Sequence, residues 1–438
     1  MGPSSLFYGL LAVPLVTRSF EFRTADWLPL HEAAERIMAG VTPLKGERVL
    51  LSDSLGRALA EDLVADATLP PWNNSGMDGF AVRAKDFKGA SKESPIRLAV
   101  IRHVRAGDAP GGPEVAQGQA VRIMTGAPVP PGADSVVRVE DTDAESESGT
   151  VQIFSDRDTG ANVRPSGQDM RPGEKLLGRG HTIAPGTVGV LASAGQARVL
   201  VHGRPCTAVL TTGDELRGPD QFQDVRSGIG IPDSNGPMIS AMVTAAGASV
   251  MQLGPSSDDE IDLRHWIDKA ADCDALITVG GASMGDADLV KRVLDGMGYR
   301  SAFWRVRMRP GSPVGFGWIP RGDRLQPVFS LPGNPTSAFV TFELLVRPFL
   351  LQLGGHRDIE RRRIVCRTEE VIRAPARLTY FLRVQLSGTG EHARVRLTGP
   401  QGSGLVSGLG RADGLAIIEE DVLTVEEGGE VTVMLIGR

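Results

Sequence analysis

Residues that build transition-metal sites are scarce in this sequence. Its 438 residues include only three cysteines and seven histidines. Cys206, Cys273 and Cys366 lie far apart along the chain, and neither a CxxC pair nor an HExxH pattern occurs, which excludes the usual zinc spacings. The cysteine pattern predicts reduced, mostly buried thiols in a reducing compartment, and hence a cytoplasmic protein.

An excess of positive charge and a long apolar run are also missing. The formal net charge is −6, so the sequence predicts no broad basic surface and no nucleic-acid partner. Residues 6–16 form an apolar run of eleven residues, too short to span a bilayer and without the basic segment of a signal peptide. No later run approaches membrane length. We expect residues 1–25 to be a disordered extension, and no membrane association.

Apolar periodicity divides the rest of the chain into segments of different structure. Residues 30–38 have the spacing of an amphipathic helix that ends before Gly40. From residue 48 to about residue 198, short apolar runs alternate with Gly, Pro and Asp, which predicts β-rich structure. Strand and helix patterns alternate over residues 204–353, as in a mostly parallel sheet covered on both faces. Strict alternation over residues 364–438 predicts a small β-barrel or sandwich.

Three polar loops follow predicted strands of the α/β segment. They span residues 211–215, 280–288 and 331–337. In such sheets ligands bind beyond the carboxyl ends of the strands, and glycine lets backbone amides approach an anion closely. Neither a P-loop nor a dinucleotide-binding glycine pattern is present in the sequence. The three loops together predict a phosphate site of another kind, although each alone also fits an ordinary turn.

Side chains in these loops supply hydroxyl and carboxylate groups. Ser283 and Ser337 are hydrogen-bond donors for a bound anion. Glu215, Asp286 and Asp288 carry the oxygen ligands that Mg²⁺ prefers, and a cation there would neutralise phosphate charge. The loops therefore predict a magnesium ion beside the phosphate.

Alternate arginines precede a Pro-Gly-Ser-Pro turn at residues 310–313. In an extended segment Arg305, Arg307 and Arg309 project from one face. Guanidinium groups fork onto phosphate or another tetrahedral oxyanion, so one interpretation is an oxyanion clamp. The alternative is a solvated edge that guards a strand against pairing.

A loop dense in turn residues occupies residues 70–82 (PPWNNSGMDGFAV). Asn, Ser, Gly and Asp after a proline pair are typical of tight turns. Turn formation alone does not require Met77, so a packed functional loop is an equally good interpretation.

These motifs together resemble one family, the molybdopterin molybdenumtransferases, which include the E domain of gephyrin. The 70–82 loop looks like the family's PxxxNSxMDGYA motif, and residues 122–134 look like its R-I-x-TGA and PxGAD signatures. Residues 162–169 resemble its N-[IV]-R-x-x-G-[ED]-D element. The segments TTGDEL, PDSN, GGASMGDAD, RPGSP and SLPGNPTS follow in the family's order. The resemblance covers the chain from about residue 27 to its end.

The resemblance implies an α/β plus β protein with four domains in each chain of a homodimer. Domain I would be discontinuous, residues 26–47 and 158–203, with a β-rich domain II inserted at residues 48–157. Residues 204–358 would form an α/β molybdopterin-binding domain III, and residues 359–438 a small β-barrel, domain IV. In the family, active sites form between domain III of one subunit and domain II of its partner.

The resemblance, together with the loop chemistry, also assigns residues to that site. Glu215 and Asp288 are the predicted Mg²⁺ ligands. The predicted catalytic residues are Asp78, Thr125, Glu215, Asp233 and Asp288. The predicted residues for binding pterin and oxyanion are Gly280, Gly281, Ser283, Gly285, Arg305, Arg309, Ser312, Pro332, Gly333, Asn334, Pro335, Ser337 and Ser403.

By the same resemblance, the protein would insert molybdate into adenylylated molybdopterin (molybdopterin-AMP) and release AMP. Mg²⁺ would be the cofactor, and a molybdopterin adenylyltransferase would be the upstream partner. Three positions depart from the family pattern: Ser312 replaces a cation, Pro232 a tyrosine and Gln168 an acidic residue. Two alternatives therefore stay open, a cofactor-binding scaffold without catalysis and an insertase that prefers tungstate.

Overall fold

The computed structural model describes residues 27–147, 149–280, 287–374 and 378–437, without the side chains of residues 287, 288 and 391. The predicted extension at residues 1–25 lies outside the described residues. The chain divides into two compact units. The first comprises the described parts of Met1–Ala60, Gly180–Pro185 and Arg198–Arg438, and the second comprises those of Glu61–Arg179 and Gly186–Ala197.

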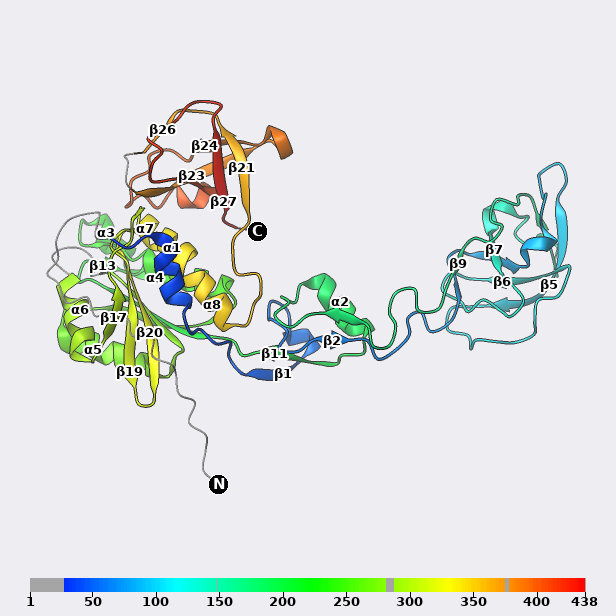
Figure 1. Ribbon diagram of the computed structural model, residues 1–438, viewed down its shortest axis with the longest axis horizontal. Helices are drawn as coiled ribbons and strands as arrows, with labels where there is room; N and C mark the ends of the chain where they lie inside the picture. Colours follow the sequence, from blue (N-terminus) through cyan, green and yellow to red (C-terminus); the bar gives the residue numbers. More distant parts are fainter. Residues whose placement is uncertain (1–26, 148, 281–286, 375–377, 438) are drawn as a thin grey trace, which may run out of the picture. The chain divides into compact units, whose positions relative to one another are not determined.

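The first unit is built around a six-stranded sheet (Figure 1). Its order is β15 (Ser249–Ser256), β12 (Cys206–Thr212), β16 (Ala275–Val279), β20 (Arg324–Leu331), β19 (Gly315–Arg321) and β17 (Arg300–Phe303). The first four strands run parallel, as the predicted alternation with helices requires. The last two are antiparallel to their neighbours.

Two antiparallel strands complete the mostly parallel sheet at one edge. A two-residue turn, Gly322-Asp323, joins β19 to β20 and is closed by the pairing of Arg321 with Arg324. Gly322 has a φ of +61°, a conformation that tight hairpin turns need and glycine adopts without strain. The prediction of a mostly parallel sheet is therefore confirmed, and the sequence pattern did not specify the antiparallel hairpin or β17.

Helices cover both faces of the sheet (Figure 1). One face carries α1 (Leu30–Met38), α4 (Asn235–Ala245), α7 (Pro335–Thr341) and α8 (Arg347–Leu353), and the other carries α5 (Glu260–Lys269) and α6 (Ala287–Gly296). Successive strand residues alternate between these layers, since Ile277 packs with the first set and Leu276 with the second. Both side chains are fully buried, and each such burial stabilises the fold by about 1.5–3 kcal/mol.

One helical run, Pro335–Leu353, has the length and composition of a membrane span. It joins α7 to α8 through a π-helical segment at Phe342–Val346. The expectation that no later segment approaches that length is therefore wrong. Since 67% of its most apolar window is buried, we interpret it as a core helix.

A closed five-stranded barrel follows, which confirms the predicted C-terminal β-barrel. Each strand pairs with the next in the order β23 (Thr379–Ser387), β24 (Arg394–Leu397), β21 (Arg363–Thr368), β27 (Glu430–Leu435) and β25 (Gly414–Ile418), and β25 returns to β23. The short strand β18 (Met308–Arg309) adds to β23. This pairing joins the predicted arginine clamp directly to the barrel.

The second unit is β-rich, as predicted. Its sheet has the order β7 (Ser135–Arg138), β4 (Gly79–Val82), β6 (Gln119–Ile123), β5 (Ile96–Val104) and β8 (Thr150–Ile153). Outgoing and returning segments of chain are paired, β2 (Leu63–Val64) with β10 (Lys175–Leu177) and β3 (Asn74–Ser75) with β9 (Val163–Arg164). In the first unit β1 (Gly46–Leu50) pairs likewise with β11 (Arg198–His202). The intervening sheet is therefore an insertion.

The sequence pattern missed helix α2 (Pro185–Ser193). Two glycines at Gly186 and Gly189 lower its helix propensity, and Pro185 favours a helix only at its first turn. Buried Thr187 and Leu191 anchor the helix. The remaining short elements are β13 (Leu216–Arg217), α3 (Phe222–Arg226), β14 (Ile231–Pro232), β22 (Ile372–Arg373) and β26 (Thr424–Val425).

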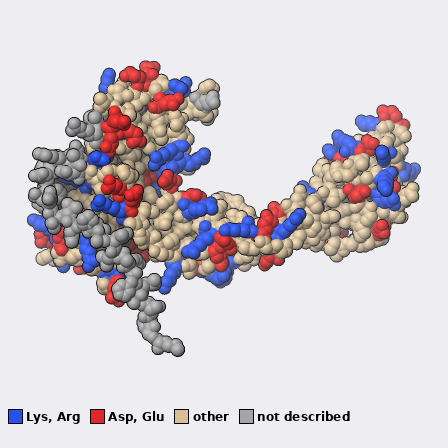
Figure 2. Space-filling view, viewed as in Figure 1, with Lys and Arg blue, Asp and Glu red and all other residues tan. Residues whose placement is uncertain are grey.

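Charged side chains of both signs are interspersed on the face drawn in Figure 2. Within the first unit, Arg292 and Glu260 form one such pair at 3.2 Å. Exposed pairs of this kind contribute at most about 1 kcal/mol each, so the packed sheets carry most of the stability.

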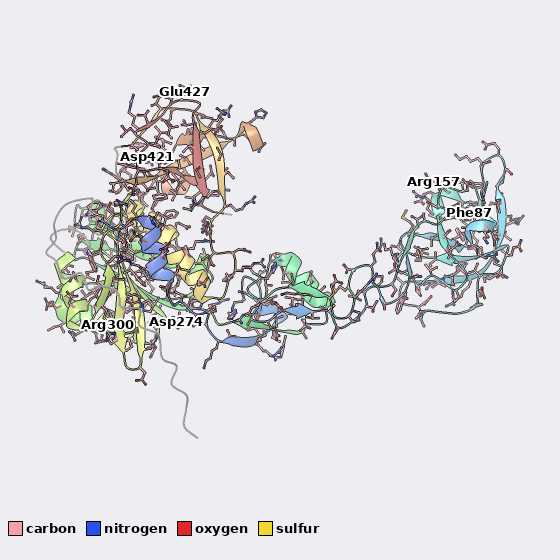
Figure 3. The ribbon with its side chains drawn as sticks, viewed as in Figure 1. Phe87, Arg157, Asp274, Arg300, Asp421 and Glu427 are labelled. Carbon is pink, nitrogen blue, oxygen red and sulfur yellow. The ribbon has the colours of Figure 1, made fainter. Side chains whose placement is uncertain are left out.

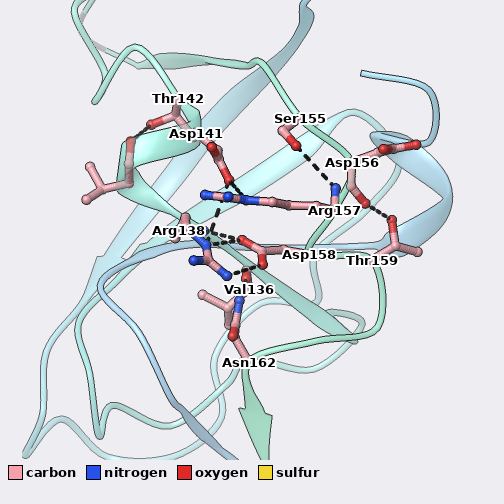
Figure 4. Close-up of polar contacts among 11 residues, drawn as sticks. Val136, Arg138, Asp141, Thr142, Ser155, Asp156, Arg157, Asp158, Thr159 and Asn162 are labelled. Atoms are coloured by element: carbon pink, nitrogen blue, oxygen red, sulfur yellow. Dashed lines mark hydrogen bonds and ion pairs between the residues drawn. The ribbon is translucent and has the colours of Figure 1, made fainter. Parts of the chain in front are cut away.

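A partly buried ion pair fixes the edge strand β7 of the second unit (Figure 4). Arg138 donates to both carboxylate oxygens of Asp158, at 2.8 and 3.0 Å, and its backbone N–H donates to the same group at 3.0 Å. Asp158 is 2% exposed. Burial raises the pKa of Asp158, but the hydrogen bonds and charge of Arg138 outweigh it, so the pKa lies below its ordinary value. Asp141 links Arg138 to the exposed Arg157.

We expect Asp158→Asn to lower the free energy of unfolding of the second unit by roughly 3 kcal/mol, because it removes the buried charge of the pair and leaves Arg138 only the longer contact with Asp141. The contribution of Asp158 is complete above about pH 3.9, the ordinary carboxyl value. It is lost as the pH falls through the lower pKa of the folded state. Urea unfolding at several pH values measures both effects. The control Arg157→Gln, at the exposed end of the network, should cost less than about 1 kcal/mol; equal losses for the two variants would contradict this account.

Candidate active site

Three predicted loops meet at the carboxyl edge of the parallel strands. Gly280, directly after β16, has a φ of +104°, and a β-carbon there would lie 2.8 Å from the Thr212 carbonyl oxygen at the end of β12. A β-carbon on Gly333 would lie 3.5 Å from the α-carbon of Gly280. The backbones at the carboxyl ends of β12, β16 and β20 thus lie close together and form one surface, as the loop pattern predicts.

The loop at residues 331–337 also contacts the barrel. The Asn334 amide donates to the Ser403 hydroxyl at 3.1 Å, and the Thr336 backbone N–H donates to the Ser403 carbonyl at 3.0 Å. Asn235 secures the other side of the loop by donating to the Gly333 carbonyl at 2.6 Å. Ser403 therefore lies beside the predicted phosphate loop, although 69 positions separate it from Asn334 in the sequence.

Other predicted residues of this loop differ in exposure. Asn334 is exposed, Pro335 begins α7, and Pro332 is buried at the end of β20. Ser337 is only 4% exposed in the first turn of α7, so its hydroxyl contributes less to the loop surface than the sequence suggests. Gly281, Ser283 and Gly285 lie outside the described residues.

A buried arginine that the sequence reading missed holds the barrel loop in place. Arg383 of β23 is fully buried and donates to the Thr336 hydroxyl, to the Pro400 carbonyl at 2.8 Å and to the Gly402 carbonyl at 3.2 Å. Burial lowers the pKa of its guanidinium. The only signal in the sequence is a charged residue inside an apolar strand pattern.

The predicted acidic residues fall into different environments. Asp233 is 8% exposed, and its carboxylate accepts from the Thr211 hydroxyl at 3.0 Å and from the Gly236 N–H at 2.9 Å. It therefore acts as a cap at the start of α4. Glu215 is exposed after β12. The backbone of Asp288 lies in the first turn of α6, but its side chain is not described.

Two further carboxylates, Asp214 and Asp258, are linked to each other after β12. Asp258 accepts from the Thr212 hydroxyl at 3.2 Å and from the Asp214 N–H at 3.4 Å, and its own N–H donates to Asp214 at 3.2 Å. Among the residues whose side chains are described, no group of three His, Cys, Asp or Glu is arranged to hold a metal. A magnesium site with Asp288 as ligand stays a prediction.

The three arginines share one side of their segment, as predicted. Buried Val306 and Met308 alternate with partly exposed Arg305 and Arg307 and exposed Arg309. The guanidinium of Arg305 lies over the Trp27 ring at 5.3 Å and that of Arg309 over the Tyr380 ring at 5.9 Å. Such stacking orients a cation without neutralising it.

Arg307 and Ser312 have local partners instead. Arg307 pairs with Glu420 at 3.4 Å, which offsets its charge. The Ser312 hydroxyl donates to the Met308 carbonyl and closes the turn. Gly311 of this turn packs on α7, where an added β-carbon would lie 3.5 Å from the Ser337 carbonyl oxygen. The positively charged segment therefore lies beside the helix that begins at the phosphate loop.

The remaining predicted residues, Asp78 and Thr125, lie together in the second unit. The backbone N–H and the hydroxyl of Thr125 donate to Oδ1 of Asp78 at 2.7 and 2.8 Å. These bonds hold the pKa of Asp78 below its ordinary value. The neighbouring Gly79 admits no side chain, because a β-carbon would lie 1.9 Å from the Val137 carbonyl oxygen.

A cavity of about 480 Å³ in the second unit brings two of the recognised motifs together. Asn74 comes from the 70–82 loop, and Arg164, Gln168 and Asp169 come from the 162–169 element. The buried Oδ1 atom of Asn74 has no hydrogen-bond partner among the described residues. Gln168, which stands where the family pattern has an acidic residue, therefore lies on the wall of a cavity.

Family models match three successive parts of the chain. Residues 28–195 match the MoeA N-terminal region (domain I and II), residues 208–352 a probable molybdopterin binding domain, and residues 366–436 the MoeA C-terminal region (domain IV). These matches cover the strand-end loops, the arginine segment, the Asp78–Thr125 pair and the barrel.

Relatives and solved structures agree with these matches. Molybdopterin molybdenumtransferase of Bacillus subtilis is 40% identical over 328 residues, 74% of this chain and 74% of the relative. Molybdopterin molybdenumtransferase 2 of Mycobacterium tuberculosis is 36% identical over 394 residues, 88% of this chain and 94% of the relative. The molybdopterin biosynthesis moeA protein of Pyrococcus horikoshii superimposes with a TM-score of 0.77 at 27% identity, covering 94% of this chain and 100% of that chain. This chain belongs to the molybdopterin molybdenumtransferase family.

Proposed function

We propose that this protein inserts molybdate into adenylylated molybdopterin and releases AMP. The observation that carries the proposal is the meeting of Gly280, Gly333 and Ser403 at the carboxyl edge of the parallel sheet. Glycine-lined backbone at the start of a helix suits a phosphate group, and the pyrophosphate of the substrate would lie over these loops.

Molybdate would bind at the arginine segment. It is a tetrahedral oxyanion, and the guanidinium groups of Arg305 and Arg309 are stacked on aromatic rings, with no carboxylate partner in the part of the chain that the structure describes. Molybdenum would exchange oxo ligands for the two dithiolene sulfurs, and the displaced oxygens would leave as water after taking up protons. Attack of water on the phosphoanhydride would release AMP and drive the insertion.

Mg²⁺ would supply charge neutralisation at the phosphoanhydride. Glu215 is an exposed carboxylate at the strand-end loops, and carboxylate oxygens are the hard ligands that Mg²⁺ prefers. We assign Glu215 and Asp288 as its ligands.

The active site would be shared between two subunits. Asp78 and Thr125 form an exposed, hydrogen-bonded pair in a different unit from the phosphate loops, as a site completed by a partner chain requires. The substrate would come from a molybdopterin adenylyltransferase in the cytoplasm.

Complementation between variants tests the shared site. Asp78→Ala and Glu215→Ala should each lower AMP release by at least ~100-fold. Co-expression of the two should restore about a quarter of wild-type activity, because random pairing gives half of the dimers one intact site. The control pair, Asp78→Ala with Thr125→Ala, affects the same half-site and should restore nothing. A mixture of Asp78→Ala and Glu215→Ala that stays inactive would contradict sharing.

The two stacked arginines should differ from Arg307 in their effect on molybdate. Arg309→Ala should raise the molybdate concentration for half-maximal insertion by about tenfold, or ~1.4 kcal/mol, since no ion pair joins its cation to an acidic side chain among the described residues. Arg307→Ala removes a cation whose charge Glu420 already offsets. It should therefore change the molybdate concentration for half-maximal insertion by less than about threefold. Molybdate titration of cofactor formation, repeated with tungstate, measures both; identical effects would exclude a clamp at Arg309.

Removal of magnesium should stop the reaction. Chelation should abolish AMP release, and added Mg²⁺ should restore it. Glu215→Gln should raise the Mg²⁺ concentration for half-maximal activity by roughly tenfold, because it removes one charged ligand. Full activity in excess chelator would refute the assigned metal role.

A further inference from the structure

Two cysteines that are distant in the sequence meet in the structure. The Sγ atoms of Cys206 and Cys273 lie 2.8 Å apart, although 67 positions separate the residues. Cys206 begins β12, and Cys273 lies two residues before β16, which pairs in parallel with β12 from Thr207 and Ala275 onwards. The separation of the cysteines along the sequence therefore gave no indication of this contact.

The backbones that carry the two thiols are held together. The Cys206 N–H donates to the Asp274 carboxylate at 2.8 Å, and the Asp274 N–H donates to the Cys206 carbonyl at 2.8 Å. On the other side, Arg324 and Gln326 donate to the Cys273 carbonyl at 3.1 and 3.0 Å. The two sulfur atoms thus approach each other from backbones with little freedom to separate.

The surroundings of the two thiols differ. Cys273 is fully buried, with the Met251 sulfur 3.9 Å from its own. Burial, together with the neighbouring Cys206, raises the pKa of the Cys273 thiol. Cys206 is partly exposed, so a small reagent in solvent reaches it first. Cys366 lies in the barrel core and does not belong to this pair.

We propose that Cys206 and Cys273 are an oxidation site that closes to a reversible disulfide in the presence of a small-molecule disulfide such as oxidised glutathione. The Cys206 thiolate attacks one sulfur of the reagent and releases one glutathione thiolate. Cys273 then attacks Cys206 in the mixed disulfide and releases the second. The two protons of the cysteine thiols pass through solvent to the two glutathione molecules, which are reduced as the protein is oxidised.

The short separation favours this outcome over a lasting mixed disulfide. A disulfide bond measures about 2.04 Å, so the two sulfur atoms need to approach by less than 1 Å. A lasting glutathione adduct on Cys206 would instead place a bulky group beside the fully buried Cys273. A resolving thiol already in contact therefore displaces it.

The dithiol lies away from the proposed active site. Cys206 and Thr212 are the two ends of β12, a length of roughly 20 Å in an extended strand. In Figure 3, Asp274 marks the end of the sheet at which the cysteines lie. Oxidation would therefore tie the amino ends of β12 and β16 and leave the loops at their carboxyl ends unmodified.

The test uses the reduced, folded protein and oxidised glutathione. We expect the intact mass to fall by two hydrogen atoms without a glutathione adduct, and the thiols titrated in denaturant to fall from three to one. Proteolysis should yield one peptide pair linked through Cys206 and Cys273. Dithiothreitol should reverse both changes, and the oxidised protein should melt at a higher temperature because a long loop is closed.

Matched serine variants locate the bond. The Cys366→Ser variant should still form the disulfide, so both of its remaining thiols should disappear from the titration. The Cys206→Ser variant should keep its two remaining thiols and show no rise in melting temperature. A stable glutathione adduct on Cys206, a link to Cys366 or three unreacted thiols in the wild-type protein would each overturn the proposal. The mass measurement on the wild-type protein does not depend on whether any variant folds. None of the readouts depends on AMP release, so this test is independent of the proposed activity.

Discussion

The parallel pairing of β12, β16 and β20 is the constraint on which the candidate site depends. Parallel strands run in the same direction with paired residues side by side. The carboxyl ends of these three strands therefore lie at one edge of the sheet. At this edge the backbone of Gly280 passes so close to Thr212 that no side chain fits. Glycine is therefore required by the sheet before any ligand is considered. The same absence of a side chain would let an anion approach the backbone closely, so packing and anion binding favour the same residue.

The barrel takes part in this site through a buried cation. Burial of a guanidinium is costly where its donors are not satisfied. The two terminal nitrogens of Arg383 donate to carbonyls of the loop at residues 400–402, whereas its Nε has no partner among the described residues. The conformation of that loop is consequently tied to the position of Arg383. Ser403 follows directly in the chain and contacts Asn334. A residue inside the barrel thus sets the position of a hydroxyl at the edge of the sheet.

The sequence predicted those parts of the molecule that depend on local periodicity. The bounds of α1 agree with the helix predicted at residues 30–38, because apolar spacing along one segment determines which face is buried. The cap at Asp233 and the Cys206–Cys273 contact were not predicted, since each depends on a partner from another element. The hairpin at Gly322 was not predicted either, because its turn is short and the surrounding sequence alternates between strand and helix patterns. The site residues were named from motifs, but their exposure required the structure.

The charge of Asp78 limits its role in the proposed reaction. Both bonds from Thr125 reach the same oxygen, Oδ1, and they hold the pKa of the carboxyl below its ordinary value, so the group is an anion at neutral pH. An anion repels molybdate and phosphate, and it therefore cannot serve as their binding group. A carboxylate has about four acceptor positions, so Asp78 retains capacity to accept hydrogen bonds from N–H groups of a pterin or from a water molecule. In a shared site, the unit with the arginines would hold the oxyanions, and the unit with Asp78 would orient hydrogen-bond donors.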